Sequence, residues 1–151
     1  MLRYDATTGD FFWRITPSRN TRIGQRAGRV HYKYGYIQIS IRGKRYQAHR
    51  LAWLYCHGKW PVGQIDHINR IRDDNRIANL RPATRSQNQA NRSLQANNTS
   101  GFKGVVFHKQ IGKWVARIGK QHIGTFDSAY DAATAYAATA TRLYGEYGIA
   151  S

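Results

Sequence analysis

The first half of the chain carries an alternation of polar and apolar positions that predicts strands followed by a helix. Residues 36–41 place isoleucine at every second position, which is the period of a half-buried strand. Residues 42–44 fit a hairpin turn, and residues 45–47 would form the returning strand. The spacing becomes helical over residues 48–57, and Gly58 is expected to end that helix.

Shorter patterns flank these elements. Residues 11–15 are aromatic and β-branched, which favours a strand near the start of the chain. Residues 60–68 and 80–84 are predicted to be extended. Ser86 is expected to cap a helix that continues to Arg92.

The second half shows a clearer pattern of three strands and one helix. Residues 102–107, 113–118 and 121–126 are strand-like, and glycine-containing turns separate them. Asp127 or Ser128 would cap the helix, and Asp131 lies in its first turn, where an acid favours the helix dipole. One apolar stripe runs along this helix, made of Ala129, Ala132, Ala133, Tyr136, Ala137, Ala140, Leu143 and Tyr144. We therefore expect three antiparallel strands on one alanine-rich helix, and an α+β fold for the chain.

Charge indicates the class of partner. The 151 residues include 24 Lys and Arg against 8 Asp and Glu, a formal net charge of +16. Residues 1–92 hold 18 of these basic residues and 5 of the acidic ones, so the first part carries most of the positive charge. Such a surplus favours a polyanion, most simply nucleic acid, with a membrane surface as the lesser alternative.

Targeting and redox features favour an intracellular setting, in a bacterium or a phage-infected host. The sequence has no run of 18 apolar residues, and residues 1–5 do not begin an apolar segment of signal-peptide length. Cys56 is the sole cysteine, which rules out an internal disulfide and argues against a thiolate zinc site. We expect Cys56 to be a small buried apolar residue.

The pair Asp66-His67, together with Asn88, has the residue types of a metal-dependent phosphodiesterase. Hydrolysis of a phosphodiester needs an activated water and a positive charge for the developing phosphorane, and one hard cation can supply that charge. Asp66 offers an anionic oxygen and Asn88 a neutral one, while His67, with an ordinary pKa of roughly 6.5, suits a general base. Adjacent strand residues point to opposite faces, so Asp66 and His67 share a site only if the strand ends or bends there.

Other interpretations of these residues stay open. An Asp-His pair also arises by chance, and Asn79 fits a hydrogen bonder that fixes a loop better than a metal ligand. His49 fits a buried residue at the start of a helix. Arg85 lies just ahead of Asn88 and could contact the scissile phosphate.

Several motif pieces, in order, resemble the HNH endonuclease family, in the branch found in phage and mobile-intron homing endonucleases. They are Ala48-His49-Arg50-Leu51-Ala52-Trp53, Ile65-Asp66-His67-Ile68-Asn69, Asn75, Asn79-Leu80-Arg81 and Ser86-Gln87-Asn88. The resemblance covers about residues 46–92. It implies a ββα-metal fold, in which a β-hairpin and a following helix surround one divalent metal.

The same resemblance implies roles for single residues. His67 matches the general base, Asp66 the first metal ligand, and Asn79 the asparagine that holds the loop and positions the base. Asn88 stands where the family often has a histidine, and this departure favours Mg²⁺ or Mn²⁺ over a softer metal. His49 matches the His-Arg-Leu lead-in, for which the sequence gives no role. The absence of cysteine pairs excludes the zinc-stabilised branch.

Residues 99–145 resemble the AP2 DNA-binding domain. The matching pieces include Ser100-Gly101-Phe102-Lys103-Gly104-Val105, Gly112-Lys113-Trp114-Val115-Ala116-Arg117-Ile118 and Ile123-Gly124-Thr125-Phe126-Asp127-Ser128-Ala129. In that family a three-stranded sheet lies in the major groove, which a β-ribbon can enter. The residues expected to face DNA are Lys103, Val106 or His108, Lys109, Lys113, Trp114, Arg117 and Lys120. Arg117 would read a guanine edge and the lysines would hold phosphates. Alternatively, Trp114 is a core residue and the lysines are solvated.

The sequence therefore predicts a site-specific DNA endonuclease of homing type in four segments. These are a basic β-rich segment (1–45), a nuclease core (46–92), a linker (93–99) and an AP2-like domain (100–151). A basic loop in the first segment would clamp the DNA backbone through Arg19, Arg22, Arg26 and Arg29. A monomer would nick double-stranded DNA, whereas a double-strand break requires a homodimer or two successive nicks. The alternatives are a non-catalytic DNA-binding regulator with a decayed HNH fold, and a basic RNA-binding protein.

Overall fold

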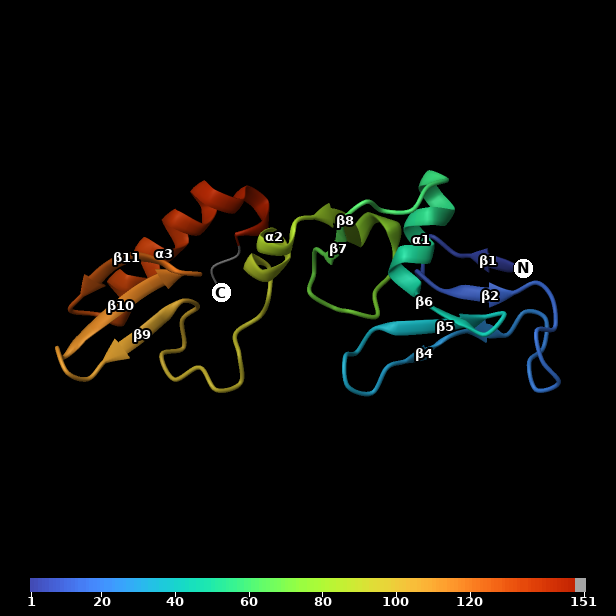
Figure 1. Cartoon of the computed structure of the whole chain (residues 1–151), viewed down its shortest axis with the longest axis horizontal. Coiled ribbons are helices and arrows are strands. Elements are labelled where there is room, and N and C mark those ends of the chain that lie inside the picture. The colour runs from blue at the N-terminus through green and yellow to red at the C-terminus, as the bar shows by residue number, and fades with distance from the viewer. Residues whose placement is uncertain (149–151) are drawn as a thin grey trace. The chain divides into compact units, whose positions relative to one another are not determined.

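The computed structural model describes residues 1–148, which form two compact units divided between Thr84 and Arg85 (Figure 1). The sequence instead placed a linker at 93–99. The difference concerns α2 (Arg85–Ala90), which packs with α3 (Ala129–Tyr144) and the 3-10 helix η2 (Gly145–Tyr147) and so groups with the second unit.

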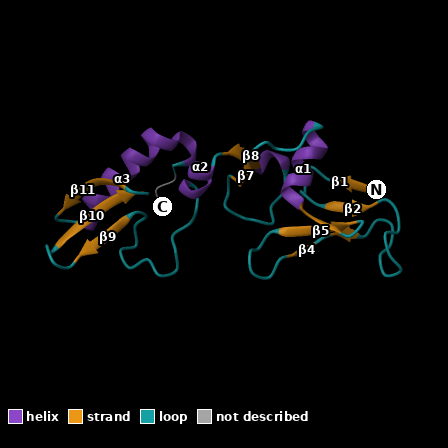
Figure 2. Ribbon diagram, viewed as in Figure 1, coloured by secondary structure: helices purple, strands orange, loops and turns teal. Residues whose placement is uncertain are grey.

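Two small antiparallel sheets begin the first unit (Figure 2). One sheet has the order β1-β2-β3, from strands Leu2–Tyr4, Phe11–Trp13 and Arg26–Ala27. The other has the order β4-β5-β6, from strands Arg29–Val30, Ile37–Ile41 and Lys44–Gln47. The predicted strand and hairpin turn are confirmed: Ile41 pairs with Lys44, and Arg42 and Gly43 have φ values of 48° and 78°. Positive φ at both central residues is the geometry of a two-residue hairpin whose twist matches its strands.

Helix α1 (Ala48–His57) lies against these sheets and closes the first core. Gly58, in the left-handed conformation, donates its N–H to the carbonyl of Leu54 and ends the helix as predicted. Arg50 fixes the chain beyond the helix, because its guanidinium donates to the carbonyls of Pro61 (3.0 Å) and Gly63 (2.9 Å). The buried core residues of the unit are Tyr4, Phe11, Trp13, Ala27, Ile37, Ile39, Ala48, Leu51, Ala52, Ile65 and Leu80.

The prediction that Cys56 is buried is wrong, since its side chain is exposed. The first two turns of α1 supply its buried residues, whereas all three residues of its last turn, including Tyr55, are exposed. The sequence pattern therefore predicted a buried face one turn longer than the face that α1 buries.

A two-stranded antiparallel ladder completes the first unit. It pairs β7 (Gln64–His67) with β8 (Leu80–Ala83), and the 3-10 helix η1 (Ile77–Asn79) leads into β8. The register sets Asp66 opposite Arg81 and His67 opposite Leu80. β7 ends at His67, so the condition under which Asp66 and His67 can serve one site is met.

The second unit holds an antiparallel sheet in the order β11-β10-β9. Its strands are β9 (Val105–His108), β10 (Lys113–Ile118) and β11 (Gln121–Phe126), and α3 shares a core with them. Ser128 caps α3 by accepting the N–H of Asp131 at 3.0 Å and donating to its carboxylate at 2.7 Å. β9 begins later than predicted because Gly104, with φ of 69°, lies against Tyr136, where any Cβ would come within 2.2 Å of the ring.

Among the described residues, no helix is both long enough and apolar enough to cross a membrane.

Candidate active site

Asp66 and His67 lie side by side at the end of β7, with 3% and 4% of their surfaces exposed. Across the ladder, Arg81 donates from Nε to Oδ2 of Asp66 at 2.9 Å. This bond fixes the orientation of the Asp66 carboxylate, which immediately precedes the histidine in the same strand and pairs across the ladder with Arg81.

The imidazole of His67 is oriented by Asn75. Nε2 of His67 lies 3.2 Å from Oδ1 of Asn75, and Asn75 donates from Nδ2 to the carbonyl of Asp73 at 3.2 Å. Since an amide oxygen only accepts, Nε2 of the neutral ring must carry the proton. This tautomer leaves the lone pair of the ring on Nδ1, which is the atom able to accept a proton.

Asn75 is itself fixed from the N-terminal segment. It is fully buried at 0% exposure, and Tyr4 donates its hydroxyl to the Asn75 carbonyl at 2.7 Å. Gly9, with φ of 77°, packs so closely that a Cβ there would lie 2.4 Å from the backbone nitrogen of Arg76. The N-terminal segment thus supports the orientation of His67.

The loop after β7 is held by Asn79. Its Oδ1 accepts the N–H of Asn69 at 3.0 Å, and its Nδ2 donates to Oδ1 of Asn69 and to the carbonyl of Asp74, both at 2.9 Å. Its carbonyl accepts the N–H of Ile68 at 2.9 Å. These bonds agree with the interpretation of Asn79 as a residue that fixes the loop.

His49 lies in the first turn of α1 and faces His67. The ring centroids are 5.2 Å apart with an interplanar angle of 81°, and Tyr36 packs against both rings. Burial lowers the pKa of His49 to about 3, with smaller electrostatic contributions from the neighbouring His67 and Arg50. Nδ1 of His49 is buried and has no hydrogen-bond partner among residues 1–148. His49 is thus a neutral wall of the site at physiological pH.

Burial also lowers the pKa of His67, although the hydrogen bond to Asn75 and the carboxylate of Asp66 act in the opposite direction. The ring is therefore neutral near pH 7. A neutral imidazole can take a proton from water or bind a metal, whereas a protonated one can do neither.

The donor atoms around Asp66 limit which cation the site could hold. Within the described part of the chain, no group of three His, Cys, Asp or Glu side chains could hold a metal ion. The carboxylate of Asp66 is the oxygen ligand that Mg²⁺ and Mn²⁺ prefer, and these ions commonly keep several water ligands. The donor chemistry therefore fits a hard cation that fills most of its shell with water and phosphate oxygens.

Arg85 and Asn88 lie on α2, in the second unit. The pairing of Asn88 with Asp66 as metal ligands, and a phosphate contact by Arg85, stay predictions.

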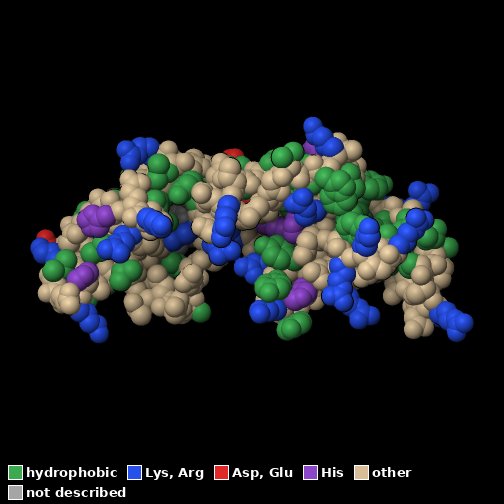
Figure 3. Space-filling model, in the orientation of Figure 1, with side chains coloured by type: hydrophobic (Ala, Val, Ile, Leu, Met, Phe, Trp, Pro, Cys, Tyr) green, Lys and Arg blue, Asp and Glu red, His purple; other side chains and the backbone are tan. Residues whose placement is uncertain are grey.

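The residues expected to face DNA in the second unit differ in their surroundings. His108, Lys109, Arg117 and Lys120 are exposed, and Lys113 pairs with Asp127. The half-buried ring of Trp114 packs against Phe107 at 5.0 Å and against the core, so this residue has features of both interpretations. Figure 3 shows basic side chains over both units and few acidic ones on the same face.

In the first unit, arginines of the basic loop were expected to contact the DNA backbone. Arg22 is exposed, and Arg26 pairs with Asp10.

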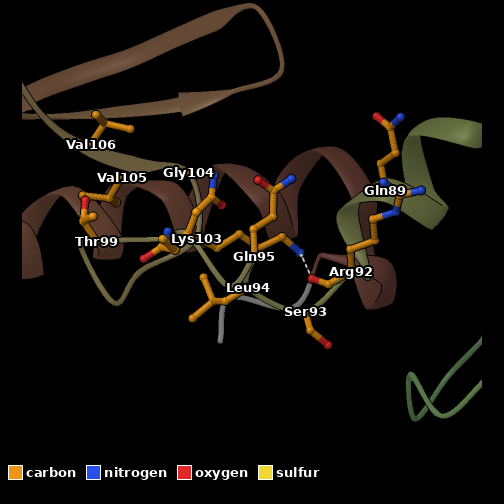
Figure 4. Close-up of a pocket in the computed structure, with 12 residues that line it drawn as sticks. Gln89, Arg92, Ser93, Leu94, Gln95, Thr99, Lys103, Gly104, Val105 and Val106 are labelled. Atoms are coloured by element: carbon orange, nitrogen blue, oxygen red, sulfur yellow. Dashed lines mark hydrogen bonds between the residues drawn. The ribbon is translucent and has the colours of Figure 1, made fainter. Parts of the chain in front are cut away.

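Lys103 lines a polar hollow of about 620 Å³ in the second unit (Figure 4). Its ammonium donates to the main-chain carbonyls of Ala90 and Arg92. Lys103 thus ties the end of α2 to the segment before β9, which gives it a structural role that the sequence did not indicate.

Sequence reasoning missed three contributors to the site. Asn75 was part of the motif but had no assigned role, and Arg81 follows Asn79-Leu80 without any signal of its ion pair. Tyr36, which lies against His49 and His67, directly precedes β5 and is about thirty residues from His67, so it has no local signal.

Comparison with known proteins supports an HNH-type protein. Residues 46–90 match the HNH endonuclease family, and this range contains α1, η1 and the β7–β8 ladder with Asp66 and His67. The chain is 36% identical over 78 residues to Protein 3.8 of Escherichia phage T7, a match that covers 49% of this chain and 64% of the phage protein. The match thus spans less than two thirds of that relative. No solved structure matches the chain.

Proposed function

We propose that this protein is a metal-dependent DNA endonuclease in which His67 is the general base. The observation that carries the proposal is the buried imidazole of His67, which Asn75 orients and which follows the carboxylate of Asp66 at the end of β7. The family match over residues 46–90 supports the class of reaction. Nδ1 of His67 would accept a proton from the water that attacks the phosphorus.

Asp66 would hold the metal, with Asn88 as the second protein ligand predicted from the sequence. When bound, Mg²⁺ or Mn²⁺ stabilises the charge on the phosphorane and on the leaving 3′ oxygen, which yields a 5′-phosphate end. Arg81 fixes the orientation of the Asp66 carboxylate through the 2.9 Å bond. Asn79 holds the loop between β7 and β8, and His49 and Tyr36 shield the base from bulk water.

The second unit would bind double-stranded DNA through the sheet β9–β11, as the resemblance to AP2 domains implies. Exposed Lys109, Arg117 and Lys120 support this role because their charges are available to phosphates. The net charge of +16 gives the whole chain affinity for DNA. One site per chain makes a nick the expected product of a monomer.

The proposal is tested with supercoiled plasmid and phage DNA in Mg²⁺, Mn²⁺ or EDTA. We expect metal-dependent conversion to open circle or linear DNA, and loss of this conversion in His67→Ala. The matched control is His57→Ala, since His57 is an exposed histidine of the same unit. Cleavage in EDTA, or equal losses in both variants, would contradict the proposal.

A non-catalytic DNA-binding regulator is the second candidate. It is favoured by the burial of Asp66 and by its ion pair with Arg81, because a guanidinium competes with a cation for the same carboxylate. Tight DNA binding without cleavage in any metal, on DNA that contains the bound sequence, would favour the regulator.

A further inference from the structure

The turn between β4 and β5 carries a histidine ring that stacks on two exposed tyrosine rings. His31 stacks on Tyr32 with centroids 5.2 Å apart and an interplanar angle of 15°, and on Tyr34 at 4.9 Å and 25°. Tyr32 is 95% exposed and Tyr34 is 51% exposed. A contiguous group of exposed aromatic rings is typical of a surface that a partner covers.

The stack is preorganised by its backbone. The N–H of His31 donates to the carbonyl of Tyr36 at 2.8 Å, and the carbonyl of His31 accepts from Tyr34 at 3.1 Å and from Gly35 at 2.8 Å. Arg72 adds a bond from Nη1 to the carbonyl of Tyr34 at 3.0 Å. Because the turn is closed by these bonds, little conformational entropy remains to be lost when a ligand stacks on it.

The turn is joined to the candidate active site by two side chains. Tyr36, which follows the turn, contacts the rings of His49 and His67. The guanidinium of Arg72 lies 5.5 Å from the centre of the Tyr36 ring and reaches the turn from the loop after β7. The turn is therefore linked to His67 through the ring of Tyr36.

The electrostatic surroundings suit a nucleic acid strand. Lys33 lies within the turn, 5.6 Å from the centre of the Tyr34 ring, and Arg29 and Arg72 flank it. The sequence has no acidic residue between Asp10 and Asp66. Exposed rings interleaved with cations bind single strands by base stacking and phosphate attraction.

We propose that the aromatic turn, His31 to Tyr34, stacks an unpaired nucleobase of the DNA substrate next to the cleavage site. In a duplex the faces of the bases are covered by their neighbours, so only an unpaired, terminal or extruded base can stack on the rings. The substrate class of this site is then DNA with unpaired nucleotides, such as an overhang, a gap or a junction. The proposal rests on the endonuclease function proposed above for the identity of the cleavage site.

The test measures binding in EDTA, so that cleavage plays no part. A single-stranded oligonucleotide and a gapped duplex carry 2-aminopurine, whose fluorescence falls on stacking, and a fully paired duplex is compared with them. We expect the full-length protein to quench the two substrates with unpaired bases. Tyr32→Ala should weaken their binding by about 5- to 150-fold with loss of quenching, while Tyr32→Phe keeps both.

The matched control is Tyr130→Ala, because Tyr130 is 72% exposed on α3 in the second unit. It should leave quenching unchanged. Unchanged quenching in Tyr32→Ala and Tyr34→Ala, an equal loss on the fully paired duplex, or a tenfold preference for RNA of the same sequence would overturn the proposal. Quenching without plasmid cleavage would contradict only the proposed endonuclease function. Cleavage without quenching would contradict only the proposed stacking site.

Discussion

Nε2 of His67 lies 3.2 Å from Oδ1 of Asn75, a side chain that is itself completely buried. This contact selects the tautomer in which Nδ1 is the basic atom. Asn75→Ala should lower the cleavage rate by roughly 10- to 100-fold, the cost typical of losing the partner that orients a functional histidine. The Michaelis constant should change little. Single-turnover cleavage measured against DNA concentration separates the two quantities, and an unchanged rate would contradict this role for Asn75.

The position of Asn75 depends on the N-terminal segment. Gly9→Ala would place a methyl group 2.4 Å from the backbone nitrogen of Arg76, so we expect a loss of stability and of cleavage. Gly24→Ala is the matched control, because Gly24 has φ of 81° against 77° for Gly9 and no described atom lies within 4 Å of its Cβ position. The difference between the two variants isolates the clash from the backbone strain. We expect the free energy of unfolding of Gly9→Ala to be about 1–3 kcal/mol lower than that of Gly24→Ala.

The ion pair of Arg81 and Asp66 gives a prediction that links stability and metal binding. Arg81→Met leaves a buried carboxylate without its guanidinium, which should lower the free energy of unfolding by roughly 3–5 kcal/mol. If Asp66 holds the cation, Mn²⁺ should raise the melting temperature of Arg81→Met more than that of the unmodified protein. Equal shifts in the two proteins would argue that Asp66 is not a ligand.

The buried His49 predicts how stability depends on acidity. Its pKa is about 3 in the folded protein and roughly 6.5 when unfolded, so below pH 6.5 the unfolded chain binds a proton that the folded chain does not. The free energy of unfolding should therefore fall as the pH decreases from 6.5 towards 3, by at most about 1.4 kcal/mol per pH unit from this group. His49→Phe should flatten that slope. Urea unfolding between pH 4 and 7 measures it.

Local patterns predicted the elements that local interactions form. The alternating isoleucines of β5, the αL cap at Gly58 and the capping pair of Ser128 and Asp131 all lie within a few residues of their partners. Asp66 and His67 were also predicted as a pair because they are adjacent in sequence. In the structure they are the last two residues of β7.

Contacts between distant segments had no such signal. The bond from Tyr4 to Asn75 joins residues 71 positions apart, and the contact of Tyr36 with His67 depends on how the residue before β5 packs against the end of β7. The exposure of Cys56 likewise follows from where the core ends and not from the helical period. These features could be identified only from the three-dimensional structure.

The central claim is that His67 is the base that activates water, and chemical rescue tests it most directly. Single-turnover cleavage is measured for His67→Ala with and without added imidazole, beside His57→Ala. We predict a rate about 10²- to 10⁴-fold below that of the unmodified protein, partly restored by imidazole, and no change in His57→Ala. Cleavage by His67→Ala at the full rate would contradict the account.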